Sequence, residues 1–575
     1  MLRAGTLEYY KEGAAGTVSV RLLTGTRSLA IDGKVDASNA GDMLTQRLLG
    51  LLPVIIHGHA EEVCIIGLGS GVTADAARAP GTVRHAAVGE ISPEVVEASH
   101  HFDAENGRVL AQPGVRLIVG DGRSHLLLTP RRYDVIVSEP SNPWMAGVAS
   151  LFTREFFEAA RSKLKPGGLL CQWAHTYDIS PADLRSIVRT FTSVFPQATL
   201  WLVGDGDLLL IGANADAIVP RLAAVDAGAR QGRTAALLAP VGVTEGTAPF
   251  ALLSLYAGGP AEIARYAGDA LIQTDDRTVL EYSAPRGIYG RAKDENVVAI
   301  RALNPERVPA VREAFERADA VAWASRGMME LKAQAFAPAY DAFRQATAID
   351  SRNVAALSGL SDAAGGSGHL NDEREWLRAL AARDPRNAPV RIELSRILAV
   401  GGDTQGALQA ASDALPLAPD DPRPGEQLAS VLADAGDGDR LSQLADAMAG
   451  RFPERIDPRY YRAVALFLKG RHEDAVAAAR QVVDAAPDHA RARGLLGAAC
   501  ATLGRRECAQ SAFDAYIRLN PRDPSGYVNA GTFSLRSAQA TAAADYFASA
   551  LAIDPSSAPA RSGLSHARAV IAGTR

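Results

Sequence analysis

The sequence has few cysteines, no long apolar run and little net charge, and each of these absences excludes a class of protein. Its 575 residues include four cysteines, which form no Cys-x-x-Cys pair and no cluster with histidine at metal-ligand spacing. No stretch of about 20 apolar residues occurs, so no membrane-spanning helix is expected. A formal charge of −5 gives no support for a general role at nucleic acids or membrane surfaces.

The cysteines and the first residues also bear on location. Cys64 and Cys171 fall on expected strands, and Cys500 and Cys508 fall on expected helices. Buried, reduced thiols are the expected state of all four, and that state fits a reducing compartment. Residues 1–10 lack the apolar stretch of a signal peptide. We therefore expect a soluble, cytoplasmic protein that reaches a membrane only through a partner.

A glycine-rich turn, Gly67-Leu-Gly-Ser-Gly71, follows a short apolar strand and opens a helix. Glycine lets the backbone turn tightly and lets a ligand approach without a Cβ in the way. The N-terminus of the helix then offers unpaired N–H groups to that ligand. Taken alone, the spacing is also typical of a turn that only packs a helix on a sheet.

Strands and helices alternate from residue 61 onward, which predicts a doubly wound parallel sheet in an α/β Rossmann-like fold of the methyltransferase type. The expected strands are 63–66, 84–88, 115–119, 133–138 and 169–173, the expected helices are 72–78, 93–106, 153–164 and 181–195, and a closing hairpin is formed by 199–203 and 208–211. A small β unit (strands 6–11, 17–23 and 28–35) and a helix over 40–52, ending before Pro53, precede this domain.

The last third of the chain repeats. Prolines at 385, 419, 453, 487, 521 and 555 recur every 34 residues, and Phe343, Phe513 and Phe547 stand in phase with them. This period is typical of the tetratricopeptide repeat, a helix pair that stacks into an all-α solenoid. The expected domains are 1–56 (β unit and connecting helix), 57–213 (Rossmann-like domain), 214–319 (helical connecting region), 320–557 (seven repeats, the second and fourth degenerate) and 558–575 (capping helix).

Acidic residues follow three strands of the expected sheet. Glu90 ends the second strand, where a carboxylate can accept both ribose hydroxyls of a nucleoside. Asp121, beside Gly122, ends the third and can reach an adenine amino group, and Glu139 follows the fourth. Ligands of open parallel sheets bind at the carboxyl ends of the strands. Together with the glycine turn, these strand ends indicate an adenosyl-type ligand.

Residues 6–212 resemble the spermidine synthase (polyamine aminopropyltransferase) family. The resemblance is carried by Ile65-Ile-Gly-Leu-Gly-Ser-Gly71, Glu90, Gly120-Asp-Gly122, Ser150-Leu-Phe-Thr153 and Lys165-Pro-Gly-Gly168. It implies a β-stranded N-terminal unit on a methyltransferase-like sheet, decarboxylated S-adenosylmethionine as co-substrate and a polyamine as acceptor. Glu139-Pro-Ser-Asn-Pro-Trp144, with Thr274-Asp-Asp276 and Ala284-Pro-Arg286, resembles a bacterial branch whose domains are often fused to membrane transporter-like segments; the sequence holds no such segment.

The resemblance also assigns roles to individual residues. An attacking amine has a pKa near ~10.4, so a carboxylate must orient it and take its proton; Glu139 holds the place of the family's catalytic Asp. The cofactor-binding positions are Gly67, Gly69, Ser70, Gly71, Glu90, Asp121 and Gly122, and the substrate-binding positions are Gln46, Asn142, Trp144 and Gln172. His175 is an alternative base and, with Tyr177, follows the fifth strand.

Four positions depart from the family pattern. Glu139 and Asn142 replace two Asp residues of the fourth-strand loop, Ser70 replaces an Asp of the glycine turn, and Thr45 replaces a Tyr. The family residues contact the substrate amines, so the departures remove charge that would hold a dication. The parts that bind the nucleoside are kept, and the parts that bind the polyamine are altered.

Three functions remain open on the sequence. The first is an aminopropyltransferase-like enzyme acting on an amine. The second is a methyltransferase that uses intact S-adenosylmethionine, and the third is a non-catalytic adenosyl-binding scaffold. The expected partners are a small amine and a protein or peptide in the groove of the repeats, with no nucleic acid and no metal; the oligomeric state stays open, a homo-oligomer included.

Overall fold

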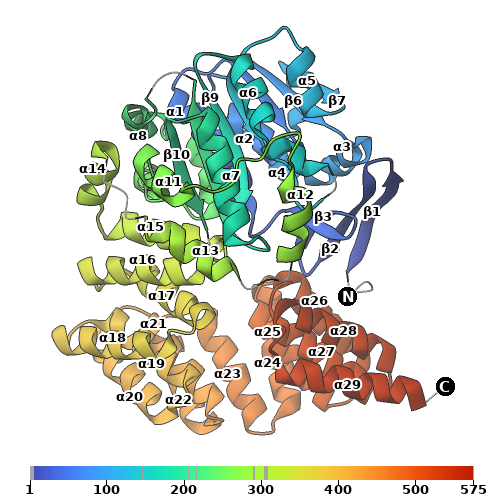
Figure 1. Ribbon diagram of the computed structural model, residues 1–575. Helices are drawn as coiled ribbons and strands as arrows, with labels where there is room; N and C mark the ends of the chain where they lie inside the picture. Colours follow the sequence, from blue (N-terminus) through green and yellow to red (C-terminus); the bar gives the residue numbers. More distant parts are fainter. Residues whose placement is uncertain are drawn as a thin grey trace. The chain divides into compact units, whose positions relative to one another are not determined.

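The computed structural model describes residues 5–145, 147–204, 206–214, 217–288, 290, 292–303 and 308–573. The chain forms two compact units (Figure 1). The first consists of Leu7–Arg21 and Arg27–Ser367 and contains the main sheet. The second consists of Met1–Thr6, Leu22–Thr26 and Gly368–Arg575 and is mainly helical. Among the described residues, no helix is long and apolar enough to cross a membrane.

A four-stranded sheet precedes the main domain, with the strand order β1-β2-β3-β4. Its strands are β1 (Thr6–Gly13), β2 (Gly16–Leu23), β3 (Thr26–Ile31) and β4 (Lys34–Ser38). The sequence predicted three strands, and the prediction of one strand over 28–35 was wrong. Asp32 and Gly33 have φ angles of 50° and 82°, so the chain turns there and β4 folds back antiparallel on β3.

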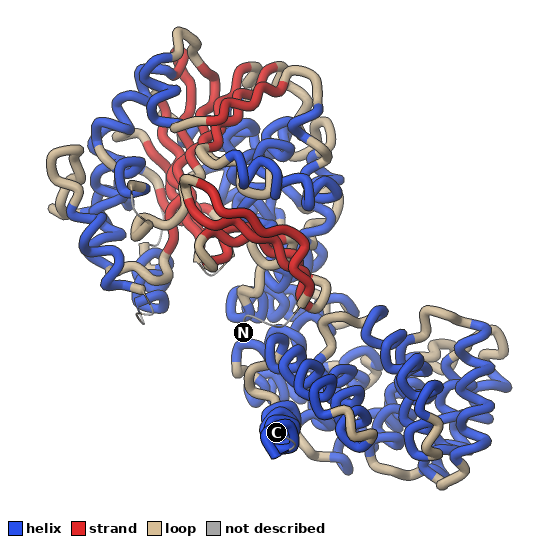
Figure 2. Tube along the Cα trace, turned by 90° about the vertical axis from the view of Figure 1, so that its right-hand side faces the viewer, coloured by secondary structure: helices blue, strands red, loops and turns tan. Residues whose placement is uncertain are grey.

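The main sheet has the strand order β12-β10-β11-β9-β8-β5-β6-β7 (Figure 2). Its strands are β5 (Glu62–Ile66), β6 (His85–Glu90), β7 (Val115–Val119), β8 (Tyr133–Ser138), β9 (Leu164–His175), β10 (Ala198–Val203), β11 (Asp207–Ala213) and β12 (Tyr256–Gly258). Strands β5 to β9 pair in parallel, and β10 and β11 add an antiparallel hairpin. This arrangement confirms the predicted Rossmann-like sheet of the methyltransferase type.

Both faces of this sheet are buried, because alternate residues of each strand enter two different cores. Val63 and Ile65 belong to the core that includes helices α1 and α2, whereas Cys64 and Ile66 belong to the core that includes α6 and α7. The helices of the domain are α1 (Met43–His57), α2 (Val72–Arg78), α3 (Pro93–Ser99), α4 (Asp103–Asn106), α5 (Gly122–Leu128), α6 (Arg154–Lys163) and α7 (Pro181–Val194).

Helix α1 differs from the prediction that it ends before Pro53. It runs on to His57 with Pro53 inside it. A proline in a helix interior removes one backbone hydrogen bond, but every residue from Met43 to Ile56 is buried. Packing of this helix against α2 and the sheet therefore outweighs the local cost of the proline.

Short helices connect the main sheet to the repeats. They are α8 (Ala224–Gly228), α9 (Thr234–Leu238), α10 (Ala248–Leu253), α11 (Pro260–Ala267), α12 (Val279–Ser283), α13 (Ala292–Arg301) and α14 (Pro309–Arg317). The acidic segment at 274–276 takes part in the packing of this region, since Asp275 forms an ion pair with Arg123 and accepts a hydrogen bond from Thr153 at 2.8 Å.

The chain beyond residue 319 consists of helices in tandem, and within each unit successive helices lie side by side (Figure 1). Those of the first unit are α15 (Ala320–Lys332), α16 (Phe336–Ile349) and α17 (Val354–Ser367). Those of the second are α18 (Leu370–Arg383), α19 (Ala388–Val400), α20 (Thr404–Ala414), α21 (Arg423–Asp434), α22 (Gly438–Arg451), α23 (Asp457–Leu468), α24 (His472–Ala485), α25 (Ala490–Thr502), α26 (Arg506–Leu519), α27 (Pro524–Arg536), α28 (Ala540–Ile553) and α29 (Ala558–Gly573).

The phased phenylalanines hold neighbouring helices together. A Cβ added at Gly531 would lie 3.0 Å from the Phe547 ring, and one added at Gly563 would lie 2.3 Å from it. Phe547 thus fills the space that two glycines leave on α27 and α29. The 34-residue period therefore corresponds to a packing contact. In it, one aromatic ring fills the space left by glycines on the helix before and the helix after its own.

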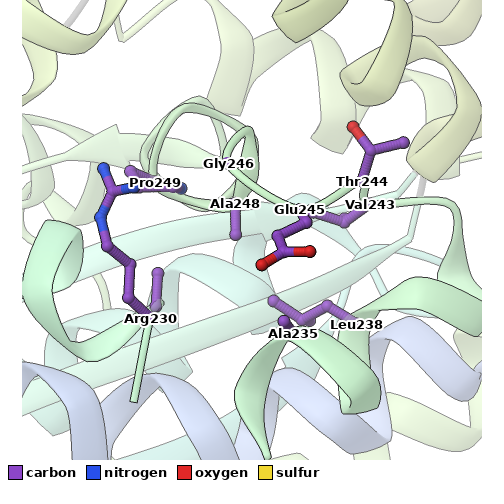
Figure 3. Close-up of a pocket in the computed structure, with 10 residues that line it drawn as sticks. Arg230, Ala235, Leu238, Val243, Thr244, Glu245, Gly246, Ala248 and Pro249 are labelled. Atoms are coloured by element: carbon purple, nitrogen blue, oxygen red, sulfur yellow. The ribbon is translucent and has the colours of Figure 1, made fainter.

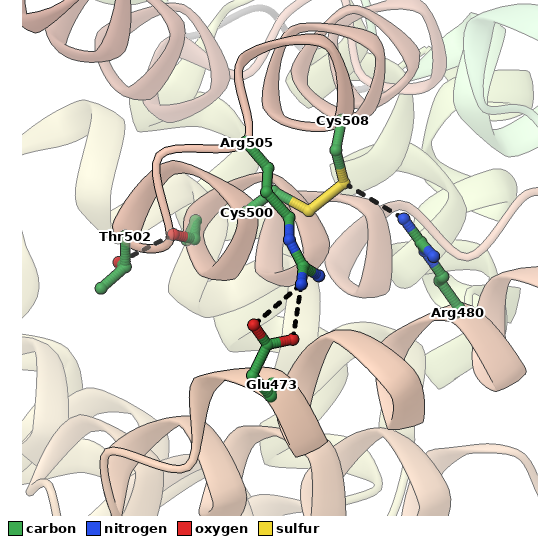
Figure 4. The surroundings of a disulfide bond; sticks show 7 residues. Glu473, Arg480, Cys500, Thr502, Arg505 and Cys508 are labelled. Carbon is green, nitrogen blue, oxygen red and sulfur yellow. Dashed lines mark hydrogen bonds and ion pairs between the residues drawn. A yellow bond between two sulfur atoms is a disulfide. The ribbon is translucent and has the colours of Figure 1, made fainter.

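Cys500 and Cys508 form a disulfide between α25 and α26, with their Cα atoms 5.9 Å apart (Figure 4). The expectation of reduced thiols is confirmed for Cys64 and Cys171 and is wrong for this pair. The spacing of eight residues gave no signal, because the turn between the two helices is what brings the sulfur atoms together. The disulfide removes the argument from reduced cysteines for a cytoplasmic location.

Thiol titration of the denatured protein tests the disulfide. We expect two free thiols before reduction and four after it. Reduction should destabilise the repeats by about 2–3 kcal/mol, the chain-entropy value for so short a loop. In the matched variant Cys508→Ala, the melting temperature should not respond to reductant. Four thiols in the unreduced protein would contradict the prediction.

Candidate functional site

The strand ends that the sequence singled out lie at one edge of the main sheet. Ile66 of β5 pairs with Gly89 of β6 on one side and with Ser138 of β8 on the other. Glu90, at the end of β6, pairs in turn with Val119 at the end of β7. The glycine turn, Glu90, Asp121 and Glu139 therefore follow neighbouring parallel strands in the order that the sequence predicts.

The glycine turn is pressed against the end of β8. Gly67 has a φ of 98°, and a Cβ at this position would lie 2.3 Å from the carbonyl oxygen of Glu139. Only glycine fits this approach. Gly71, with a φ of 83°, precedes the first residue of α2. The turn thus brings the start of α2 next to Glu139, the carboxylate that the resemblance identifies as the base.

Ser70 and Gln46 form a buried network beneath the turn. The Ser70 hydroxyl donates a hydrogen bond to Gln46 Oε1. Gln46 Nε2 donates to the Ser38 carbonyl at 3.0 Å and to Asp42 Oδ2 at 2.9 Å. All polar atoms of the Gln46 amide are therefore occupied within the protein. The structure places this predicted substrate-binding residue where it joins β4, α1 and the glycine turn.

Glu90 is buried and held by the backbone. Its carboxylate accepts hydrogen bonds from Leu68 N at 3.0 Å and Ser92 N at 2.9 Å. Burial raises the pKa of Glu90, and these N–H groups oppose the shift. The next residue, Ile91, is 60% exposed. This pair of groups is complementary to a nucleoside. The Glu90 carboxylate can accept hydrogen bonds from ribose hydroxyls, and the exposed Ile91 side chain can pack against a flat base.

Asp121 is exposed and caps helix α5. Its carboxylate accepts hydrogen bonds from Arg123 N at 3.2 Å and Ser124 N at 2.9 Å. Gly122, the first residue of α5, lies against β5, since a Cβ there would be 2.5 Å from Ile66. Helix capping alone explains why a carboxylate stands at position 121. The Ser124 hydroxyl also donates to Oδ2 at 2.6 Å, so the second lone pair of Oδ1 remains for a ligand.

Four carboxylates form an acidic cluster, which we define as Asp36, Asp42, Glu139 and Asp207. Burial raises the pKa of Glu139 to about 8; a hydrogen bond with Thr73 opposes this shift, and the other three carboxylates add to it. Burial likewise raises the pKa of Asp207 to about 6. Negative charges that raise the pKa of Glu139 favour a cationic ligand, because a cation relieves their repulsion.

Asn142 and His175 bond to each other. Asn142 Nδ2 lies 3.0 Å from His175 Nε2, and His175 Nδ1 lies 2.6 Å from the Tyr177 carbonyl oxygen. The carbonyl can only accept, so Nδ1 carries the proton and Nε2 accepts from Asn142. Burial lowers the pKa of His175 to about 3. This imidazole is neutral with both nitrogens occupied, which argues against the alternative base that the sequence left open.

The aromatic side chains near the cluster pack on His175. The rings of Trp144, Trp173 and Tyr177 have centroids 5.0, 5.1 and 4.5 Å from that of His175. Lys34 Nζ lies 5.8 Å from the centroid of Trp144 and 2.7 Å from Asp36. The predicted substrate-binding residue Trp144 therefore already contacts a cation, in the geometry that would suit an ammonium ligand.

Near the ends of β8 and β9, three buried polar atoms have no hydrogen-bond partner among the residues that the structure describes. They are Ser138 Oγ, Asn142 Oδ1 and Gln172 Oε1. Gln172 uses its Nε2 to donate to the Trp173 carbonyl at 3.0 Å. A buried unpaired polar atom costs about 1–3 kcal/mol, so these atoms mark unused capacity to accept hydrogen bonds. The amide oxygens suit a ligand that donates N–H groups.

Two cavities of the described residues lie away from this edge. One, of about 310 Å³, is lined by residues of 229–249, including Arg230 and Glu245 (Figure 3). The other, of about 200 Å³, is lined by Glu62, His85 and Tyr133, at the amino ends of the strands. Neither includes a predicted site residue. Among the described residues, no group of three or more His, Cys, Asp or Glu side chains could hold a metal ion.

Fold and strand-end geometry together define a methyltransferase-like α/β domain of the spermidine synthase type followed by tetratricopeptide repeats. Residues 43–203 match the family model of the spermine/spermidine synthase domain, and segments within 359–558 match the tetratricopeptide repeat. The chain is 32% identical over 178 residues to polyamine aminopropyltransferase 2 of Pseudomonas aeruginosa, covering 30% of this chain and 50% of that protein. It is 30% identical over 171 residues to spermidine synthase of Dictyostelium discoideum, covering 29% and 59%.

A solved spermidine synthase from Thermotoga maritima superposes with a TM-score of 0.34 at 19% identity, covering 37% of this chain and 75% of that one. The chain spans about half the length of the curated relatives it matches. The comparisons therefore bear on the sheet domain and on the repeats separately.

Sequence reasoning missed three members of the acidic cluster. Asp36 and Asp42 come from β4 and the start of α1, outside the alternating strands and helices. Asp207 begins β11, which the sequence predicted only as one half of a hairpin. Since β11 runs antiparallel to β9, its first residue lies at the edge where the parallel strands end. The predicted hairpin could therefore have indicated that Asp207 lies at this edge, because the second strand of a hairpin reverses direction.

Replacing Gln46 tests whether its amide acts as a structural link. In Gln46→Ala, Ser70, Asp42 and the Ser38 carbonyl each lose a partner, so we expect destabilisation by about 1–3 kcal/mol in chemical denaturation. Gln231→Ala, a change at an exposed glutamine, should leave stability unchanged. Unchanged stability in Gln46→Ala would contradict the structural role.

Proposed function

We propose that this chain transfers the aminopropyl group of decarboxylated S-adenosylmethionine to an amine. The observation that carries the proposal is the acidic cluster beside the glycine turn, at the edge of the sheet where such folds bind ligands. The similarity of residues 43–203 to the spermine/spermidine synthase domain supports it. The names of the relatives describe the activities of those proteins. The activity proposed for this chain rests on the residues of its own site.

Glu139 is the proposed base. An amine nitrogen attacks the carbon beside the sulfonium, the carbon–sulfur bond breaks, and 5′-methylthioadenosine leaves with the bonding electrons. The attacking nitrogen must lose one proton, which the Glu139 carboxylate accepts. A carboxylate with a pKa of about 8 is a better proton acceptor than an ordinary one. Its backbone position is fixed by the hydrogen bond from Glu139 N to Ile66 O at 2.9 Å.

The proposed adenosyl contacts lie on the other side of the turn. Gly69 leaves room for the ligand, whereas the absent Cβ atoms of Gly67 and Gly71 admit the Glu139 carbonyl and the Asn106 side chain. Ser70 bonds to Gln46 within the proposed cradle, and Gly122 lets β5 and α5 approach each other. The Glu90 carboxylate, already oriented by two N–H groups, would accept the ribose hydroxyls, and Ile91 would lie against the base. Asp121 would accept the adenine amino group while it caps α5. These residues fit a nucleoside without rearrangement of the backbone.

The acidic cluster favours decarboxylated over intact S-adenosylmethionine, because the intact molecule brings an extra carboxylate. Calorimetry with both ligands tests the proposal. We expect the decarboxylated form to bind more tightly by about 10-fold or more. Tighter binding of the intact form would indicate the methyltransferase alternative. If neither binds, both enzyme hypotheses fail and the protein acts through its repeats.

The pH dependence of the reaction tests the role of Glu139. The ionised carboxylate forms above its pKa, so we expect kcat/KM to rise as the pH increases through about 8. Glu139→Gln should lower kcat by on the order of 10²–10⁴ and abolish this rise. Glu158→Gln, the same change at an exposed position of α6, should behave like wild type. A Glu139→Gln enzyme that retains the full rate would exclude Glu139 as the base.

We further propose that the repeats bind a protein or peptide partner, as stacked helix pairs present a continuous groove. Membership of the branch with transporter-like fusions is proposed only on the motif Glu139-Pro-Ser-Asn-Pro-Trp144. Three further points are proposed from the sequence alone. They are a bacterial origin, the domain boundaries given above and the formation of a homo-oligomer. A pull-down with the full chain would detect a protein partner of the repeats, and the calorimetry described above would detect the small ligands. The two measurements separate partner binding from the proposed enzymatic activity.

A further inference from the structure

Asp207 projects from the same face of the sheet as Glu139. Val137 lies two residues before Glu139, and Leu209 lies two residues after Asp207; both belong to the core that α1 covers. Side chains two residues apart on a strand share a face. Only β9 separates β8 from β11, so the two backbones lie on the order of 10 Å apart.

Two other residues fix the Asp207 carboxylate. The Thr45 hydroxyl donates a hydrogen bond to Oδ2 at 2.5 Å, and Trp173 Nε1 donates to Oδ1 at 3.1 Å. Thr45 comes from α1 and Trp173 from β9. Each carboxylate oxygen therefore has one donor, and each keeps a lone pair for a ligand. A donor on both oxygens holds the group in a single orientation.

A buried acceptor atom is connected to Asp207 through His175. Asp207 pairs in register with His175, which is bonded to Asn142. Asn142 is fully buried, and its Oδ1 has no hydrogen-bond partner. The charged groups that act on Asp207 and Glu139 include the carboxylates of Asp36 and Asp42, and Lys293 acts on Asp207. Negative charge and an unpaired acceptor thus occur together, on the side of Glu139 that faces away from the nucleoside contacts.

We propose that Asp207, positioned by Thr45 and Trp173, binds the non-reacting ammonium of a diamine acceptor, while Glu139 binds the amine that attacks. This inference rests on the proposed aminopropyl transfer and adds Asp207 to the proposed site; the polyamine class of the acceptor is what the resemblance already implies. Asn142 is neutral, so it supplies a hydrogen bond and no charge. Asp207 supplies the second negative charge from a different strand.

The test compares two acceptors that differ in one ammonium group, 1,4-diaminobutane and butylamine. In Asp207→Asn, kcat/KM for the diamine should fall by about 10- to 100-fold, the value of one charge-assisted hydrogen bond, mainly through KM. The same constant for butylamine should not change. Binding of 5′-methylthioadenosine, measured by calorimetry, should also stay the same and shows that the variant is folded.

Two further variants complete the design. Asp226→Asn makes the same change in an exposed ion pair with Arg230 and should leave both acceptors unaffected. Thr45→Val removes one donor and keeps the charge, so its effect on the diamine should be smaller than that of Asp207→Asn. Equal losses for diamine and monoamine, or no loss for either, would overturn the proposal.

Failure of the proposed function can be told apart from failure of this inference. If wild-type protein transfers nothing to any amine, the proposed reaction fails. Asp207 is then tested by calorimetry of 1,4-diaminobutane in the presence of 5′-methylthioadenosine. Binding that is lost in Asp207→Asn supports the assignment. Absence of diamine binding to wild type overturns it.

Discussion

The close contact between the turn after β5 and the end of β8 fixes the geometry of the whole candidate site. Gly67 N donates to Gly89 O, and Glu139 N donates to Ile66 O, both at 2.9 Å. These bonds continue the sheet beyond its strands, so the turn and the acidic residue form one rigid piece of backbone. A displacement of about 1 Å can cost a reaction on the order of 100-fold. Glycine at position 67 is the condition for this contact.

The acidic cluster links the charge of a ligand to the protonation of Glu139. Burial and the neighbouring carboxylates raise the pKa of Glu139 to about 8, so the group is mostly protonated at neutral pH. A bound ammonium opposes those charges and lowers this pKa. Under the proposed function, the arrival of a diamine therefore generates the ionised base that its reaction needs. A neutral acceptor would not have this effect.

The position of the strand-end residues at one edge of the sheet could be predicted from the sequence, and the position of the carboxylates from other segments could not. Gly67, Glu90 and Asp121 each follow a strand in a repeated local pattern, so their place at the sheet edge follows from topology. Asp42 and Asp207 come from a helix before the sheet and from a strand that runs the opposite way. Their proximity to Glu139 depends on packing between distant segments. The fold itself was predictable for the same reason, except where Asp32 and Gly33 split a strand and where burial carried α1 past Pro53.

Two of the departures from the family pattern, Ser70 and Thr45, are hydrogen-bonded to other residues of the candidate site. Ser70 bonds to Gln46, so the glycine turn is tied to α1 by neutral groups. Thr45 donates a hydrogen bond to Asp207, so α1 is tied to the first residue of β11. Charge lost at positions 70 and 142 is thus accompanied by charge at position 207. Each ammonium group of a bound diamine needs a negative charge near it, but that charge need not come from any particular strand. The site with Glu139 and Asp207 is therefore compatible with a diamine.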